Sequence, residues 1–205
     1  MVAALVFSFA AISTYAPVWR AGATVVAPAE RTEGNWVIIR RQDVEAAVSI
    51  VSRGAYTLVH RPLRFFDSEH CAPTEKSLAF GPAMLTMAIL GIPAYLATGD
   101  PVLTFNVDLV QYSLISAAAM YLLIAEWTGV PAAGIIAGLL FAFHRIRMEA
   151  IQFPMDSNLA WTVFALFFAR RLFARGRWRD AAGLALVVAL LIWESFFDRR
   201  PQRGA

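Results

Sequence analysis

The chain has 205 residues, of which 59% are hydrophobic and only 16% charged, and its mean hydropathy is +0.56. Soluble globular chains carry roughly 25% charged residues, so this composition excludes an ordinary soluble protein and predicts a polytopic membrane protein. The net charge of +3 comes largely from arginines at the ends of apolar segments, a pattern typical of membrane proteins, and we expect no nucleic-acid partner.

The apolar blocks are the predicted elements, because a helix needs roughly 20 apolar residues to cross a hydrocarbon core. The first block follows Met1 without a basic segment, which favours a retained first helix over a cleaved signal peptide. The predicted fold class is therefore all-α, a polytopic transmembrane helical bundle of about five or six spans in a single membrane domain, residues 1–205. The predicted spans are residues 2–19, 82–98, 102–125, 130–143, 151–169 and 181–197.

Two of these spans are imperfect. Residues 130–143 extend only about 21 Å as a helix, which is short for a full crossing. Pro154 and Asp156 predict that the helix in the next block begins only near Leu159.

A basic connector predicts the orientation. Residues 170–180 hold five arginines and one aspartate, which the positive-inside rule assigns to the cytoplasm. Four candidate spans separate this connector from the long polar stretch, residues 20–81. If all four spans cross the membrane, the long polar stretch is cytoplasmic. If residues 130–143 do not cross, it is extracytoplasmic. We expect it to be extracytoplasmic.

The long polar stretch contains a predicted amphipathic helix at residues 43–59. Asp43 is expected at its start, where a carboxylate caps free N–H groups, and Pro62 is expected to end it. The helix lies either on the membrane surface or packed on the membrane domain, and the sequence leaves both open. Its apolar stripe consists of Val44, Val48, Val51, Ala55 and Leu58.

Polar and aromatic residues follow this helix. Phe65 and Phe66 are expected to anchor at the membrane interface. Glu69 and His70 favour a solvated loop over a metal site, because a metal ion needs more ligands than this run offers. Cys71 is the only cysteine, so no thiolate metal cluster and no internal disulfide is expected.

One carboxylate, Asp108, lies inside the predicted span 102–125. A charged side chain in the bilayer is costly, so it must face protein or water. Either it has a functional role or it snorkels to the nearby interface, and the sequence does not separate the two.

Several runs along the chain resemble bacterial membrane glycosyltransferases of the GT-C class, which are distant relatives of protein O-mannosyltransferases and aminoarabinose transferases. The resemblance extends over residues 43–180, and it depends on the order and spacing of the runs together. The runs are RPLRFFD (61–67), LAF (78–80), GIP (91–93), TGDPVLTFN (98–106), MYLL (120–123), TG (128–129) and GLLFAF (138–143).

The resemblance implies transfer of a sugar from a polyprenyl-phosphate donor at the extracytoplasmic face of a bacterial inner membrane. We expect no metal and no other cofactor. The resemblance also implies an acidic residue in the first external loop as general base or acceptor-positioning group, and Asp43 matches best, with Glu33 and Asp67 in reserve. Arg147 matches the position that meets the donor phosphate, and Glu69 and His70 are further substrate-binding candidates.

The implied chemistry is reasonable, because a carboxylate can take the proton of an attacking hydroxyl and an arginine can stabilise a phosphate leaving group. Members of the class have more spans than this chain, so the resemblance implies an N-terminal portion, truncated at its C-terminus. The expected partners are membrane lipid and a polyprenyl-phosphate-linked sugar. Two other readings stay open: a transporter subunit, and a non-catalytic membrane protein that binds lipid-linked sugar.

Overall fold

The described part of the chain is all-helical. The computed structural model describes residues 1–16, 35–67, 76–80, 83–144 and 159–194, with side chains in the second range from residue 44 onward. Within these ranges there is no strand, so the predicted all-α class is confirmed. The elements are α1 (Val2–Thr14), α3 (Asn35–His60), η2 (Pro62–Arg64), η4 (Ser77–Phe80), α4 (Leu85–Thr98), α5 (Pro101–Thr128), α6 (Pro131–Phe143), α9 (Leu159–Arg175) and α10 (Trp178–Glu194).

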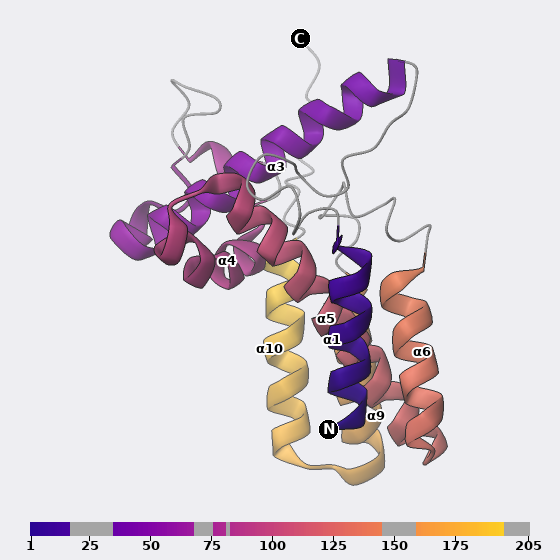
Figure 1. Ribbon diagram of the computed structural model, residues 1–205. Helices are drawn as coiled ribbons and strands as arrows, with labels where there is room; N and C mark the ends of the chain where they lie inside the picture. Colours follow the sequence, from indigo (N-terminus) through magenta and orange to yellow (C-terminus); the bar gives the residue numbers. More distant parts are fainter. Residues whose placement is uncertain (17–34, 68–75, 81–82, 145–158, 195–205) are drawn as a thin grey trace.

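Helix α5 is the axis of the molecule. Its first half packs against α3 and α4, and its second half against α6 and α9, while α1 contacts α5 and α6 and α10 contacts α9 (Figure 1). Among the described helices, α5 alone is long and apolar enough to cross a membrane, and α1, α4 and α6 are shorter apolar helices. Helices α3 and α4 lie at one end of the bundle, and the turn between α9 and α10 lies at the other.

The turns on either side of α5 follow from their residue types. Gly99 and Gly129 end α4 and α5 in the left-handed region, with φ of 65° and 73°, which glycine adopts without a steric penalty. The Asp100 side chain caps α5 by accepting a hydrogen bond from the Leu103 N–H at 2.8 Å.

Helix α6 packs closely on the second half of α5 through two glycines. A Cβ atom on Gly138 would lie 2.7 Å from the carbonyl oxygen of Ala117, and one on Gly134 would lie 2.7 Å from that of Tyr121. Small residues four apart on one helix let two backbones approach, which is a common way to pack helices in a bilayer.

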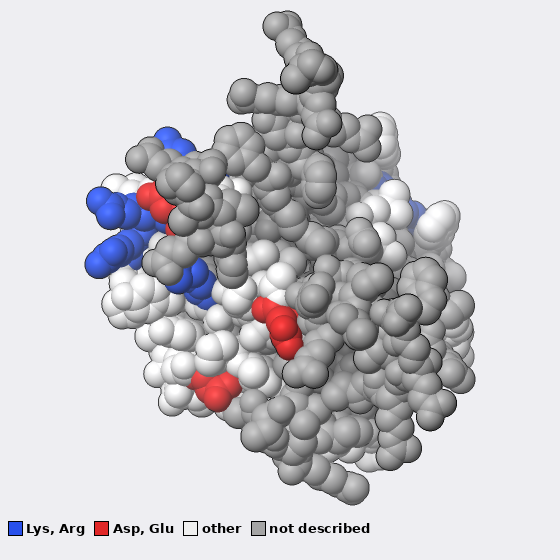
Figure 2. Space-filling view, turned by 90° about the horizontal axis from the view of Figure 1, so that it is seen from above, with Lys and Arg blue, Asp and Glu red and all other residues white. Residues whose placement is uncertain are grey.

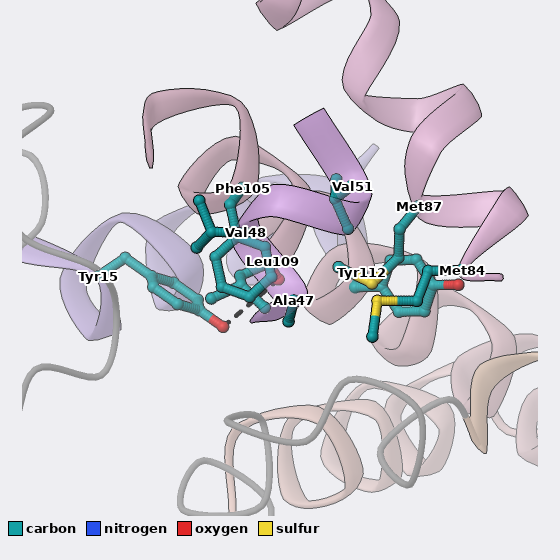
Figure 3. Close-up of a cluster of buried hydrophobic side chains, with 9 residues drawn as sticks. All are labelled: Tyr15, Ala47, Val48, Val51, Met84, Met87, Phe105, Leu109 and Tyr112. Carbon is teal, nitrogen blue, oxygen red and sulfur yellow. Dashed lines mark hydrogen bonds between the residues drawn. The ribbon is translucent and has the colours of Figure 1, made fainter. Parts of the chain in front are cut away.

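Helix α3 begins earlier than the sequence predicted. It starts at Asn35 and not at Asp43, because no glycine or proline interrupts the residues between them. Its predicted apolar stripe is buried: Val48 and Val51 join Leu109 of α5 and Met87 of α4 in one hydrophobic cluster (Figure 3). Of the two alternatives for this helix, packing on the helical domain is therefore the correct one.

The segment after α3 folds back onto it. Pro62 follows the end of α3 at His60, as predicted. Phe65 is only 5% exposed and lies against Gly54, so the prediction that it anchors at a membrane interface is wrong. The missing side chain at Gly54 opens the space that the ring occupies, and burial in that space is more favourable than exposure.

Helix α4 forms an antiparallel pair with the first half of α5. Gly91 lies against Thr104 and Asp108, and Ala88 lies against Gly54 of α3. Helix α4 therefore occupies the α3 end of the bundle, whereas α6 runs along the second half of α5. Helix α9 is described from Leu159, where the described residues resume after 144, so its predicted start stays a prediction. Helix α10 begins three residues before the predicted start.

Candidate functional site

Helix α5 carries buried polar side chains between Thr104 and Ser116. Two of them satisfy their hydroxyl groups within the helix: Thr104 donates to the carbonyl of Asp100 at 2.7 Å, and Ser113 to that of Leu109 at 3.0 Å. We name this set the polar core of α5; it consists of Thr104, Asn106, Asp108, Ser113 and Ser116.

Asp108 is the ionisable member of the polar core. It is 0% exposed, and a Cβ on Gly91 would lie 2.9 Å from its Oδ2 atom. The absence of a side chain at Gly91 therefore makes room for the carboxylate between α4 and α5. This burial excludes the snorkelling alternative and confirms that Asp108 faces the protein interior. A buried carboxylate in an apolar bundle is a functional-site hypothesis by default.

Tyrosine hydroxyls connect three other helices to α5 beside the polar core. Tyr112 shares a 2.6 Å hydrogen bond with Thr86 at the start of α4 and accepts one from the Trp161 indole of α9 at 3.2 Å. Tyr15, at the end of α1, shares a 2.8 Å hydrogen bond with Ser113. These contacts fix α1, α4 and α9 around the same stretch of α5.

The opposite end of α5 carries an ion-pair cluster. Glu126 binds Arg171 at 3.4 Å and also binds Arg175, and Arg171 binds Asp180 at 2.9 Å. The Arg170 guanidinium lies over the Trp127 ring. The sequence reading did not single out Glu126; its place at the helix end, with two arginines one turn apart on a later helix, was the available signal.

The expected catalytic residue Asp43 lies inside α3, a little over two turns from its start. The expectation that it caps the helix is therefore wrong. Its side chain is outside the described set, but its backbone lies one turn before Ala47, which shares a hydrophobic cluster with Leu109 of α5. The crossing of α3 and α5 thus brings the backbone of Asp43 and the Asp108 carboxylate to the same end of the bundle.

The reserve residue Asp67 is exposed and follows η2. Phe65, two residues before it, packs on Gly54, which lies roughly 16 Å along the axis of α3 from Asp43. The two carboxylates therefore do not form one pair. The other expected site residues, Glu33, Glu69, His70 and Arg147, lie outside the described residues.

No group of three or more histidine, cysteine or acidic side chains suited to a metal ion occurs among the described residues. Comparison with models of protein families, with curated proteins and with solved structures found no match.

Proposed function

We propose that the chain is an integral, multi-pass protein of a bacterial inner membrane. The observation that carries this proposal is the apolar outer surface of the bundle. Helices α1, α6 and α10 bury few side chains and expose large apolar ones, which in water would be unfavourable but in lipid are not. The exposed side chains are Val2, Leu5, Phe9 and Ile12 of α1, Ile136 and Leu140 of α6, and Leu186, Val188 and Ile192 of α10.

The dimensions of α5 agree with a membrane. Leu109, which contacts α3, and Glu126, which contacts the arginines, are separated by 17 residues. This is roughly 25 Å along the helix, close to the ~30 Å thickness of a hydrocarbon core. The α3 end and the arginine end would then lie at opposite faces of the bilayer.

This arrangement supports an extracytoplasmic α3. Because α4 stays at the α3 end, three helices, α5, α6 and α9, connect that end to the arginine turn. The odd number puts the two ends on opposite sides, and the positive-inside rule puts the arginines in the cytoplasm. The expectation from the sequence was the same side, chiefly because of the resemblance to GT-C glycosyltransferases, and the parity of the predicted spans agreed only if residues 130–143 do not cross. In the structure α4 is the helix that stays at one end.

We further propose that the chain is a GT-C-like glycosyltransferase, or the N-terminal part of one, that uses a polyprenyl-phosphate sugar donor. Support comes from the resemblance and from the position of α3, whose backbone at Asp43 lies at the end of the bundle that we propose is extracytoplasmic. There the carboxylate would accept a proton from the acceptor hydroxyl. The phosphate leaves without protonation, so a second acid is not needed.

The test is Asp43→Asn, with Asp67→Asn as the matched control at the exposed carboxylate. Membranes that contain each variant are incubated with a polyprenyl-phosphate sugar, and transfer and donor binding are measured separately. We expect Asp43→Asn to abolish transfer while donor binding stays intact, and Asp67→Asn to retain both. Full transfer by Asp43→Asn would refute Asp43 as the base, and donor binding without transfer by the unsubstituted chain would support the non-catalytic alternative.

A further inference from the structure

The short helix η2 carries an apolar side chain that has no protein contact surface. Leu63 is 100% exposed, between Arg61 and Arg64, which are both exposed. Nearby on the last turn of α3, Val59 is 40% exposed. An exposed leucine between two cations suits a phospholipid interface, where the apolar group enters the acyl region and the cations meet phosphates.

The segment is held rigidly. Pro62 fixes the backbone at the start of η2, and Phe65 is buried against Gly54 with Ala83 and Ala88 in the same cluster. The Arg64 and Phe65 N–H groups donate to the carbonyls of Arg61 and Pro62 at 2.9 and 3.3 Å. Leu63 is thus presented by a fixed turn, so its exposure costs no further ordering when it inserts.

A third cation lies beside the turn. Lys76 is exposed, two residues before Leu78, whose N–H donates to the Phe66 carbonyl at 3.1 Å. Basic side chains gather at one edge of the face shown in Figure 2, with few acidic ones among them. Among the described residues of the segment from Arg61 to Lys76, the three cations outnumber the one carboxylate, Asp67.

The apolar surface continues onto α4. Ile89 and Leu96 of α4 are 46% and 61% exposed, and α4 has no charged residue. Helices α3 and α4 extend sideways from the bundle at this end, beyond α10 (Figure 1). The turn therefore overhangs the region that lipid would occupy around the bundle.

We propose that η2 and α4 form a docking surface for anionic phospholipids of the leaflet at the α3 end. Leu63 inserts below the phosphates, and Arg61, Arg64 and Lys76 bind the phosphate oxygens. This inference depends on the integral-membrane part of the proposed function and is independent of sugar transfer. It replaces Phe65, which is buried, with Leu63 as the residue that enters the interface.

The test uses the full chain in liposomes of phosphatidylcholine, with or without phosphatidylglycerol. A fluorescent label is attached through Leu63→Cys in a Cys71→Ser background. Quenching by brominated lipid is compared with quenching by aqueous iodide. Two reference labels use Ala46→Cys, on the exposed side of α3, and Leu140→Cys, on the outer face of α6.

With phosphatidylglycerol, we expect the label at position 63 to be quenched by brominated lipid and protected from iodide. The label at position 46 should be quenched by iodide and not by brominated lipid. Because each arginine near an anionic surface contributes a factor of roughly five in binding, Arg61→Gln with Arg64→Gln should shift position 63 strongly towards iodide. The same pair of changes at Arg177 and Arg179, at the other end of the bundle, should have no effect.

Three results overturn the proposal or one part of it, and they can be told apart. If iodide quenches the label at position 63 as strongly as the label at position 46, while lipid quenches the label at position 140, the docking surface is refuted and the membrane bundle stands. Iodide access at position 140 refutes the membrane bundle itself, and the docking surface with it. Equal lipid quenching at position 63 without phosphatidylglycerol refutes the role of the cations.

Discussion

Gly138→Ala tests the packing of α6 on α5 most sharply. The new methyl group would lie 2.7 Å from the Ala117 carbonyl oxygen and 2.6 Å from the Phe7 ring. The ring can turn, but the carbonyl belongs to α5 and cannot move without moving that helix. Overpacking of this kind costs up to roughly 3 kcal/mol. Alanine recovers about 1 kcal/mol in helix propensity, so we expect a net loss of about 2 kcal/mol in the free energy of unfolding.

The matched control is Gly183→Ala in α10. There the nearest atom to a new Cβ is Cε1 of the Phe168 ring, at 2.6 Å, and no backbone atom is among its three nearest neighbours. The ring can rotate away, so the gain in propensity should leave the stability nearly unchanged. Both variants are unfolded in mixed micelles with increasing dodecyl sulfate, followed by tryptophan fluorescence. If Gly138→Ala is as stable as Gly183→Ala, the close approach of α5 and α6 is wrong.

Three further changes probe the rest of the bundle. Tyr112→Phe removes the hydroxyl that bonds to Thr86 and Trp161, and it should lower the free energy of unfolding by about 2 kcal/mol in the same assay. The control Tyr121→Phe should be nearly neutral, and equal effects of the two changes would contradict the hydroxyl network. Glu126→Gln should destabilise the protein by about 1 kcal/mol at low salt and by less at high salt, and a salt-independent loss would argue against the ion pairs. Gly99→Ala should cost about 1 kcal/mol through its backbone alone, since its Cβ would meet no atom within 4 Å, and an unchanged stability would contradict the left-handed turn.

The sequence predicted the helices well where composition decides them. Apolar blocks bounded by glycine and proline predicted α5 and α6 to within three residues, because turn chemistry at Gly99 and Gly129 is local. The sequence placed the start of α3 too late, at Asp43. The apolar stripe marks only the part of α3 that packs on α4 and α5, and no glycine or proline between Asn35 and Asp43 breaks the helix.

Tertiary contacts were the part that the sequence could not supply. The burial of Phe65 depends on the space at Gly54, which is distant in sequence and has no signature of its own. The burial of Asp108 was one of two alternatives that the sequence left open, and its place against Gly91 follows from the way α4 pairs with α5. The separation of Asp67 from Asp43 likewise depends on how η2 folds back onto α3.

The most direct test of the account is the sidedness of the two ends of the bundle. In a Cys71→Ser background, Asp67→Cys marks the α3 end and Arg177→Cys marks the arginine end, both at exposed positions. A membrane-impermeant maleimide is applied to intact cells with the outer membrane made permeable, and again after lysis. The account predicts labelling at position 67 before lysis and at position 177 only afterwards. Labelling of both positions under the same condition would contradict a bundle that separates its two ends by a membrane.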